Sequence, residues 1–430
     1  MGGVFIDKII IRGGINLKGD VTLNGFKHAL VPILASSILT DKTVIIQNVP
    51  RIKDTFVLTE ILNNIGVYCE LKGHTMKIRS RNPIPNDFLV SDLFSSIHGS
   101  LYLLPALLAR VGRVKISYPG GCKIGVRPIK NVAFVLRRFG AKVKFKNKII
   151  DAYLAKTPET TKIILNFKYN KYYSSATKSA IIMGALTKRT IIKNAYRAPE
   201  IIDLAQFLKA TGVNIEGAGT KEIQIEGAED MKGCKYSIMP DLIELGTFIG
   251  AVGIAHGTIT INNIPEQPLN LFGNHLSYFS KMGVDFYRKN KKLKIVCDNR
   301  LKSVKIVARP YPGIYSDLQP IFCAMMSTSV GCGEIKETVW ENRFKYVKEL
   351  KKMGAKIRVI GNKLVVKGVE RLKGCILEAT DLRGAAAMVL AGLNADGETV
   401  VNNAFHIERG YEDFDKKLKN IGAEITRRQD

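Results

Sequence analysis

The stretch Phe139-Gly140-Ala141-Lys142-Val143-Lys144-Phe145 shows the pattern from which the fold can be predicted. An amphipathic segment, 131–138, precedes the glycine, and alternating apolar and charged residues follow it. A glycine just past a helix supplies a left-handed cap, and alternation with a period of two is typical of a half-buried strand. We therefore predict a helix that ends at Gly140 and turns directly into a strand.

The same signal returns along the whole chain at nearly constant intervals. A glycine between an apolar or small residue and a Val or Ala occurs at Gly66, Gly140, Gly212, Gly283, Gly354 and Gly422. The interval falls from 74 residues at the first step to 68 at the last, and is about 71 in between. Amphipathic segments such as 54–64 and 343–352 precede these glycines. The sequence thus repeats a helix–glycine–strand piece six times.

A second helix, rich in small and apolar residues and followed by a strand, precedes each of these pieces. These helices are predicted at 29–39, 100–109, 176–186, 242–255, 318–326 and 382–393. Together the two patterns indicate an α/β protein of six β-α-β-α-β-β units of about 71 residues. Three such units make a domain of ordinary size, so we expect two pseudo-symmetric domains.

Composition limits the class of protein. The 430 residues are 46% hydrophobic and 24% charged, which is typical of a globular protein and excludes global disorder. No apolar run reaches the ~18 residues that a membrane span needs, and no signal-peptide pattern is seen at the N-terminus, so we expect a cytoplasmic protein. Lys and Arg number 65 against 38 Asp and Glu, a net charge of +27. This excess favours an anionic partner: nucleic acid, a membrane surface or a phosphorylated small molecule.

The seven cysteines predict neither a disulfide framework nor a zinc site, because no pair has Cys-x-x-Cys spacing. The six histidines likewise lack metal-ligand spacing. Cys122 differs from the other cysteines because it lies in the loop 118–128, which holds three glycines and two prolines. Lys123 and Arg127 lie near it and favour the thiolate. Cys122 is thus either a reactive thiol or an incidental one.

Polar residues begin several of the predicted helices. The positive charge of Lys27 opposes the helix dipole at the start of its predicted helix. An anion bound at this helix start would explain the lysine; the alternative is a lysine whose side chain is solvated. Asp241, Asp317 and Asp381 each stand at or near a helix start, where an aspartate is most often an N-cap.

These motifs, in this order, resemble the enolpyruvyl transferase family over the whole chain. The segments that carry the resemblance are 25–32, 119–128, 194–203, 337–344, 381–385 and 406–411. The resemblance implies a two-domain inside-out α/β barrel with three β-α-β-α-β-β units in each domain. The implied domains are 27–239, and 1–26 together with 240–430.

The resemblance also implies the reaction. An acceptor hydroxyl adds to C2 of phosphoenolpyruvate, C3 is protonated, and phosphate is expelled, with no metal or organic cofactor. The implied acceptor is the 3-hydroxyl of UDP-N-acetylglucosamine, in the first committed step of peptidoglycan synthesis. The expected partners are these two small molecules, with no nucleic acid and no membrane; the oligomeric state is not implied.

Site residues follow from the same resemblance. Lys27 matches the family lysine that holds phosphoenolpyruvate, and Cys122 the lid-loop cysteine that serves in acid chemistry or product release and is the target of fosfomycin. Asp317 matches the proposed base for the acceptor hydroxyl, and Asp381 a carboxylate near the methylene carbon. The implied substrate-binding positions are His28, His98, Arg127, Tyr173, Ser174, Arg343, Arg383 and Arg409.

Several positions depart from the family pattern: His98 on the donor side, where the family has an arginine near the phosphate, and His28, Lys130, Tyr173, Ala198 and Leu242 on the acceptor side. The departures favour, as an alternative, a paralogue that acts on another nucleotide or nucleotide-sugar hydroxyl. His98 in place of a family arginine favours a third possibility, a catalytically weak homologue that acts as a binding protein. RNA binding through the basic charge is a fourth. The Pro-Gly-Gly-Cys122 loop disfavours a shikimate-phosphate acceptor, because it belongs to the nucleotide-sugar branch.

Overall fold

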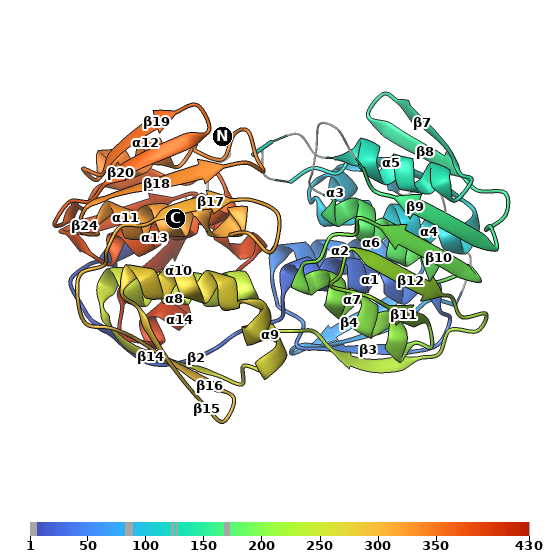
Figure 1. The fold of residues 1–430 in the computed structure, drawn as a ribbon, viewed down its shortest axis with the longest axis horizontal. Helices are drawn as coiled ribbons and strands as arrows, with labels where there is room; N and C mark the ends of the chain where they lie inside the picture. The colour runs from blue at the N-terminus through green and yellow to red at the C-terminus, as the bar shows by residue number, and fades with distance from the viewer. Residues whose placement is uncertain (1–6, 82–88, 122–123, 126–127, 167–172, 430) are drawn as a thin grey trace. The chain divides into compact units, whose positions relative to one another are not determined.

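The computed structural model describes residues 7–81, 89–121, 124–125, 128–166 and 173–429. They group into two compact units (Figure 1). Unit 1 comprises Met1–Asn24, Lys123–Val126 and Pro240–Asp430, and unit 2 comprises Gly25–Cys122 and Arg127–Met239. Each unit is a mixed α/β structure in its own right.

Unit 2 contains three sheets in the part of the chain that is described. Their strand orders are β13(Cys234–Ser237)-β3(Val44–Gln47)-β5(Thr75–Arg79)-β4(Tyr68–Lys72), β6(Arg113–Ser117)-β8(Ile149–Tyr153)-β7(Lys142–Lys146) and β11(Asn214–Glu216)-β12(Glu222–Glu226)-β10(Arg189–Lys193)-β9(Thr160–Ile164). The longer helices are α1(Lys27–Ser36), α2(Lys53–Asn64), α4(Leu103–Val111), α5(Ile129–Arg138), α6(Ser174–Gly184) and α7(Pro199–Ala210). Shorter ones are α3(Asp92–Ser95), η1(Ser37–Leu39) and η3(Gly99–Tyr102).

The described residues of unit 1 form three larger sheets and a two-stranded one. Their orders are β15(Asp285–Lys289)-β16(Lys292–Cys297)-β14(Gly257–Asn262)-β2(Leu17–Thr22), β17(Lys305–Ala308)-β18(Cys332–Glu337)-β20(Lys363–Lys367)-β19(Lys356–Ile360), β22(Ile376–Glu378)-β24(Glu398–Asn402)-β1(Asp7–Arg12)-β25(Glu424–Gln429) and β21(Leu372–Lys373)-β23(Ala395–Asp396). The helices are α8(Leu242–Ala255), α9(Glu266–Leu271), α10(Gly273–Met282), η4(Ser316–Leu318), α11(Gln319–Ser327), α12(Val347–Lys352), α13(Leu382–Gly392), η5(Ala404–Arg409) and α14(Phe414–Asn420).

The larger sheets share one pairing pattern. A strand after a buried helix pairs antiparallel with one strand of a hairpin, as β10 pairs with β12 and β12 with β11. In β22-β24-β1-β25 the place of the hairpin is taken by β1 and β25, which are far apart in sequence. In all but β6-β8-β7, a parallel strand completes the sheet, as β9 pairs with β10. Distant parts of the chain also close sheets, since β1 pairs with β24 and β25, and β13 pairs with β3. Long-range strand pairing therefore holds each unit together.

The six glycines that the sequence predicts as helix caps all adopt the left-handed region. Their φ angles lie between 82° at Gly66 and 104° at Gly283. At Gly140, for example, the chain leaves α5 and enters β7 directly. The helix–glycine–strand prediction is confirmed at these positions, although the segment predicted as helical over 343–352 forms a helix only from Val347.

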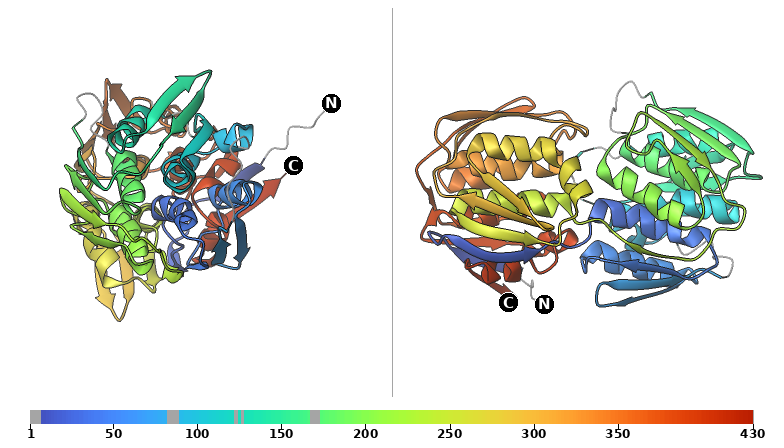
Figure 2. Two further views of the ribbon diagram at one scale, coloured as in Figure 1. Left: turned by 90° about the vertical axis from the view of Figure 1, so that its right-hand side faces the viewer. Right: turned by 60° about the horizontal axis from the view of Figure 1, so that its bottom comes forward.

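Helices α8, α11 and α13 form the core of unit 1. Every residue of the three is buried, and they pack against one another (Figure 2). Such helices are apolar nearly all round, as buried helices must be. Glycines on α8 allow the close approach: a Cβ at Gly250 would come within 2.4 Å of Ile321 Cγ2 on α11, and one at Gly246 within 2.6 Å of Leu318 Cδ2.

This packing predicts that Gly250→Ala destabilises the protein by about 1–3 kcal/mol, the usual cost of overpacking a core. The better helix propensity of alanine, about 1 kcal/mol, offsets only part of this cost. Gly273→Ala on α10 is the matched control, because its Cβ would meet nothing within 4 Å. Urea unfolding of both variants measures the difference, and equal stabilities would contradict the prediction.

Candidate functional site

A carboxylate held by two buried arginines forms the polar centre of unit 1. Asp317 Oδ1 accepts a hydrogen bond from Arg343 Nη2 at 3.0 Å, and Asp317 Oδ2 accepts one from Arg383 Nε at 3.1 Å. Both arginine side chains are 2% exposed, while that of Asp317 is 20% exposed. Two cations are therefore held almost out of water, with one carboxylate between them.

Arg343 reaches this cluster because the chain turns sharply before α12. Glu337 Oε1 accepts hydrogen bonds from the backbone of Val339 and Trp340, which bends the chain just after β18. Arg343 Nε then donates to the carbonyl of Ser316 at 3.1 Å, and its Nη1 lies 3.6 Å from Asp381 Oδ1. The requirement for this turn explains why the helix predicted from residue 343 begins later.

Arg383 has hydrogen-bond donors beyond the one that binds Asp317. Its guanidinium lies over the ring of Tyr411, 4.9 Å from the centroid, and only Nε is used by Asp317. Within the described residues, Nη1 and Nη2 are buried with no hydrogen-bond partner. Buried donors are rarely left unpaired, and a guanidinium fork matches carboxylate or phosphate oxygens. Arg383 is thus equipped to bind an anionic ligand.

Two of the three predicted N-cap aspartates are caps, and one is not. Asp381 Oδ1 accepts from the backbone of Arg383 and Gly384, and Asp241 Oδ1 from that of Ile243 and Glu244. Burial raises the pKa of Asp241 to about 6, against the opposing charge of Arg383. Asp317 lies inside η4, and its carboxylate binds arginine side chains instead of capping the backbone N–H groups of a helix start. The N-cap interpretation of Asp317 is therefore wrong.

An aromatic stack supports the segment that leads to Asp317. The ring of His275 lies between Phe272 and Tyr315, with centroids 4.5 Å and 4.8 Å away. His275 Nε2 accepts a hydrogen bond from the backbone N–H of Tyr315 at 3.1 Å. Burial lowers the pKa of His275 to about 3, so the ring is neutral and can accept this bond at neutral pH. The stack holds the chain two residues before Asp317.

The low pKa of His275 predicts a specific loss of stability in acid. In the unfolded chain a histidine binds its proton near pH 6.5, whereas the folded ring stays neutral down to about pH 3. Between these values the unfolded state binds more protons, so stability falls as pH falls. The stability of the wild type relative to His275→Gln should decrease by roughly 1.4 kcal/mol per pH unit from pH 6 to pH 4. Urea unfolding at several pH values tests this, and a constant difference would contradict it.

In unit 2, Lys27 begins α1 and already has an anionic neighbour. Its Nζ lies 2.8 Å from Asp54 Oδ2 on α2, and the two side chains are 13% and 2% exposed. The anion that the sequence suggested beside this lysine is thus, in this structure, a carboxylate of the same unit. Asp54 fixes the ammonium group at the start of α1, where backbone N–H groups also favour negative charge.

Other predicted site residues of unit 2 lie at the starts of neighbouring helices. His28 follows Lys27 in the first turn of α1, and His98 immediately precedes η3. Tyr173 immediately precedes α6, and Ser174 is its first, buried residue. Helix α1 packs against η3 and α7, and α6 against the same two elements. Cys122 and Arg127 fall outside the described residues.

Comparisons with known proteins show the family to which the chain belongs. Residues 11–418 match the family described as EPSP synthase (3-phosphoshikimate 1-carboxyvinyltransferase). The chain belongs to the enolpyruvyl transferase family. It is 39% identical to the UDP-N-acetylglucosamine 1-carboxyvinyltransferase of Thermotoga maritima, over 97% of this chain and 98% of that protein. The enzyme of the same name from Thermodesulfovibrio yellowstonii is also 39% identical, over 98% and 100% of the two chains.

Solved structures show the same fold. The crystal structure of the enolpyruvyl transferase NikO from Streptomyces tendae matches 99% of this chain and 100% of its own, with a TM-score of 0.88 and 29% identity. An EPSP synthase from Acinetobacter baumannii matches with a TM-score of 0.77 but only 15% identity, and thus shares the fold alone. The enolpyruvyl transferase therefore shares its fold with these proteins over nearly all of its length.

The positions that depart from the family pattern are spread over several elements. Lys130 is exposed on α5, whereas Ala198 is buried just before α7. Leu242 is the first residue of α8 and is fully buried. Arg409, which keeps the family pattern, is half-buried at the end of η5. These placements leave Asp317, Arg343, Asp381 and Arg383 as the residues that the structure brings together in unit 1.

Sequence reasoning missed several partners of the site residues. Asp54, Lys178 and Tyr411 contact the predicted site residues Lys27, His28 and Arg383, and Glu200 in turn pairs with Lys178. Most of these pairs join helices that are distant in sequence, which no local pattern reveals. One signal was present for Lys178: a proline inside α1 leaves a backbone carbonyl in need of a donor.

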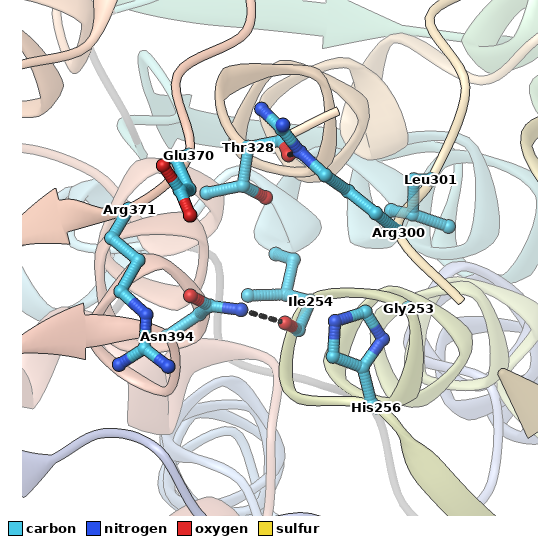
Figure 3. Close-up of a pocket in the computed structure, with 9 residues that line it drawn as sticks. All are labelled: Gly253, Ile254, His256, Arg300, Leu301, Thr328, Glu370, Arg371 and Asn394. Atoms are coloured by element: carbon cyan, nitrogen blue, oxygen red, sulfur yellow. Dashed lines mark hydrogen bonds between the residues drawn. The ribbon is translucent and has the colours of Figure 1, made fainter. Parts of the chain in front are cut away.

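A cavity in unit 1 lies at the other ends of the same core helices (Figure 3). It is lined by the final turn of α8 and by residues that follow α11 and α13, among them Thr328 and Asn394. Its polar groups cap helix carbonyls: Asn394 Nδ2 donates to Ile254 O at 2.6 Å, and Arg300 Nε to Thr328 O at 2.8 Å. Because these donors are in use, we do not assign the chemistry to this cavity.

The described residues contain no cluster of three or more His, Cys, Asp or Glu that could hold a metal ion. In the same part of the chain, no helix has the length and apolar character to cross a membrane.

Proposed function

We propose that this enolpyruvyl transferase moves the enolpyruvyl group of phosphoenolpyruvate to the 3-hydroxyl of UDP-N-acetylglucosamine and releases phosphate, the first committed step of peptidoglycan synthesis. The observation that carries the proposal is Asp317 held between Arg343 and Arg383, with two buried donors of Arg383 left open. The full-length relatives that bear the name of this activity support the choice of acceptor.

The chemistry suits these groups. Asp317 accepts the proton of the acceptor hydroxyl as its oxygen attacks C2 of the donor, while C3 gains a proton. In the second step C3 loses a proton, the C2–O bond to phosphate breaks, and phosphate leaves with the electron pair. Arg383 binds the anionic donor, and Asp381, whose Oδ2 is buried without a partner among the described residues, faces the carbon that gains and loses the proton. Fixed charges of this kind stabilise the transition state in a site with little water.

Residues of unit 2 complete the proposal. Lys27 binds the phosphate or carboxylate of phosphoenolpyruvate, with Asp54 holding its ammonium group. His28, Tyr173 and Ser174 contribute to acceptor binding, and His98 lies on the side of the phosphate donor. Cys122 keeps the role that the resemblance implies, as the lid-loop residue that serves in acid chemistry or product release and that fosfomycin alkylates. Arg127 and Arg409 keep their implied role as arginines that bind the anionic donor. No metal or organic cofactor is needed for any step.

The finer points of architecture and location belong to the same proposal. We propose that the six larger sheets are the β parts of six β-α-β-α-β-β repeats, arranged as a two-domain inside-out barrel. The proposed domains are 27–239, and 1–26 with 240–430; the shared strand pairing and the two compact units support this division. The enzyme is proposed to act in the cytoplasm on small molecules, with no nucleic-acid or membrane partner.

The acceptor is tested by phosphate release. Purified protein with phosphoenolpyruvate and UDP-N-acetylglucosamine should release inorganic phosphate, and omission of the acceptor should abolish the release. The second candidate, transfer to another nucleotide or nucleotide sugar, is favoured by the changes at His28, His98 and Tyr173. Release with UMP or another UDP-sugar but not with UDP-N-acetylglucosamine would support that candidate, and no release with any acceptor would contradict both.

Two side chains are expected to dominate the rate. Lys27→Ala and Asp317→Ala should each lower kcat/KM by at least ~100-fold, the scale of an electrostatic or acid–base contribution. Asp317→Asn, which keeps the shape between the arginines, should lose as much. Lys53→Ala is the matched control, since this exposed lysine begins the neighbouring helix α2. Near-normal rates in the site variants would show that the assigned roles are wrong.

A further inference from the structure

Helix α1 contains a proline that removes a backbone hydrogen bond next to Lys27. Pro32 lies inside this helix and has no N–H group. The carbonyl four residues earlier, that of His28, therefore has no helical donor. A backbone carbonyl that is shielded from water needs another donor, because an unpaired one costs free energy. The His28 carbonyl lies in the same turn as Lys27, on which the proposed chemistry depends.

Lys178 of helix α6 supplies this donor. Its Nζ donates to the carbonyl oxygen of His28 at 3.1 Å, and the side chain is only 3% exposed. The same ammonium group lies 3.6 Å from Glu200 Oε1 and 5.5 Å from the ring centroid of Tyr102. Lys178 thus joins the first turn of α1 to the first turn of α7 and to η3. Burial lowers its pKa, and the charge of Glu200 opposes that shift.

Glu200 depends on the same lysine. Its side chain is 1% exposed, and its Oε2 has no hydrogen-bond partner within the described residues. A buried carboxylate needs a compensating charge or hydrogen bonds. Loss of Lys178 would therefore have two separate effects: an uncompensated buried charge at Glu200, and loss of the ammonium donor to the His28 carbonyl. The first effect concerns stability, and the second concerns the geometry of the α1 start.

We propose that Lys178 is a positioning residue of this enzyme: by donating to the His28 carbonyl, it fixes the first turn of α1 and so the ammonium group of Lys27. The effect on catalysis rests on the proposed function, whereas the effect on the helix start does not. Asp54 holds the side chain of Lys27, and Lys178 holds the backbone that carries it. A small displacement of a positioned group can cost up to ~100-fold in rate.

A set of four variants separates positioning from simple stabilisation. Lys178→Met combined with Glu200→Gln removes the buried charge pair as a whole, so it leaves no lone charge but still leaves the His28 carbonyl without the lysine. Pro32→Ala restores an N–H group four residues after His28. Pro32→Ala is therefore added both to this double variant and to the wild type. The single variant Lys178→Met serves as the reference for lost stability.

Two measurements are made on each full-length variant: hydrogen exchange of the backbone amides in 27–36, and kcat/KM for phosphoenolpyruvate in the phosphate-release assay. In the double variant we expect faster exchange in α1 and a roughly 10- to 100-fold lower kcat/KM. Pro32→Ala should reverse most of both changes in the double variant, but should not improve the wild type. Unchanged exchange, or no recovery on adding Pro32→Ala, would overturn the positioning role.

The two readouts distinguish failure of this inference from failure of the proposed function. If the wild type releases no phosphate, the proposed function is wrong, while the exchange pattern of the four variants still decides the role of Lys178. If the wild type is active and the double variant keeps wild-type kcat/KM, Lys178 and Glu200 are only a buried pair, and the positioning role is wrong.

Discussion

The structure of unit 1 depends on the ion cluster of Asp317, Arg343 and Arg383. Two guanidinium groups that are 2% exposed would be costly side by side without an anion between them. Asp317 supplies that anion with one oxygen for each arginine. The cluster therefore fixes three distant segments, η4, the turn before α12 and the start of α13, in one place. The same arrangement leaves buried donors of Arg383 available to a ligand.

Unit 2 uses buried ion pairs in a related way. Lys27 pairs with Asp54, and Lys178 pairs with Glu200 while donating to the backbone of α1. In both units the core helices are largely apolar and closely packed, whereas most of the charged side chains named here stand at or near helix starts; Lys178, inside α6, is the exception. Packing supplies rigidity, and the helix starts supply positioned charge, which is the arrangement that electrostatic catalysis requires.

Local features of the fold were predictable from the sequence. The six cap glycines, the fully buried helices such as 242–255, and the caps at Asp241 and Asp381 depend on neighbours within a few residues, so a local pattern is enough. Arg343 was indicated by the family resemblance, but the turn that brings it to Asp317 was not. The pairs 27 with 54 and 178 with 200 join separate helices, and only the three-dimensional packing brings them together.

The basic charge of the chain is only partly explained by this chemistry. The net charge is +27, and the ligand-binding cations proposed above are few. Much of the excess lies on exposed strands, as in β7, whose residues Lys142, Lys144 and Lys146 all point to solvent. Such positions are those where the alternation of a strand places polar residues on the solvated face of a sheet.

The fate of one oxygen atom tests the central claim most directly. Phosphoenolpyruvate labelled with oxygen-18 at the bridging C2–O position should be incubated with the protein and UDP-N-acetylglucosamine, and the products analysed by mass spectrometry. Enolpyruvyl transfer breaks the C2–O bond, so the label should appear in phosphate, with an unlabelled enolpyruvyl ether on the acceptor. Label retained in pyruvate, with no acceptor ether formed, would show cleavage of the P–O bond and would contradict the proposed function.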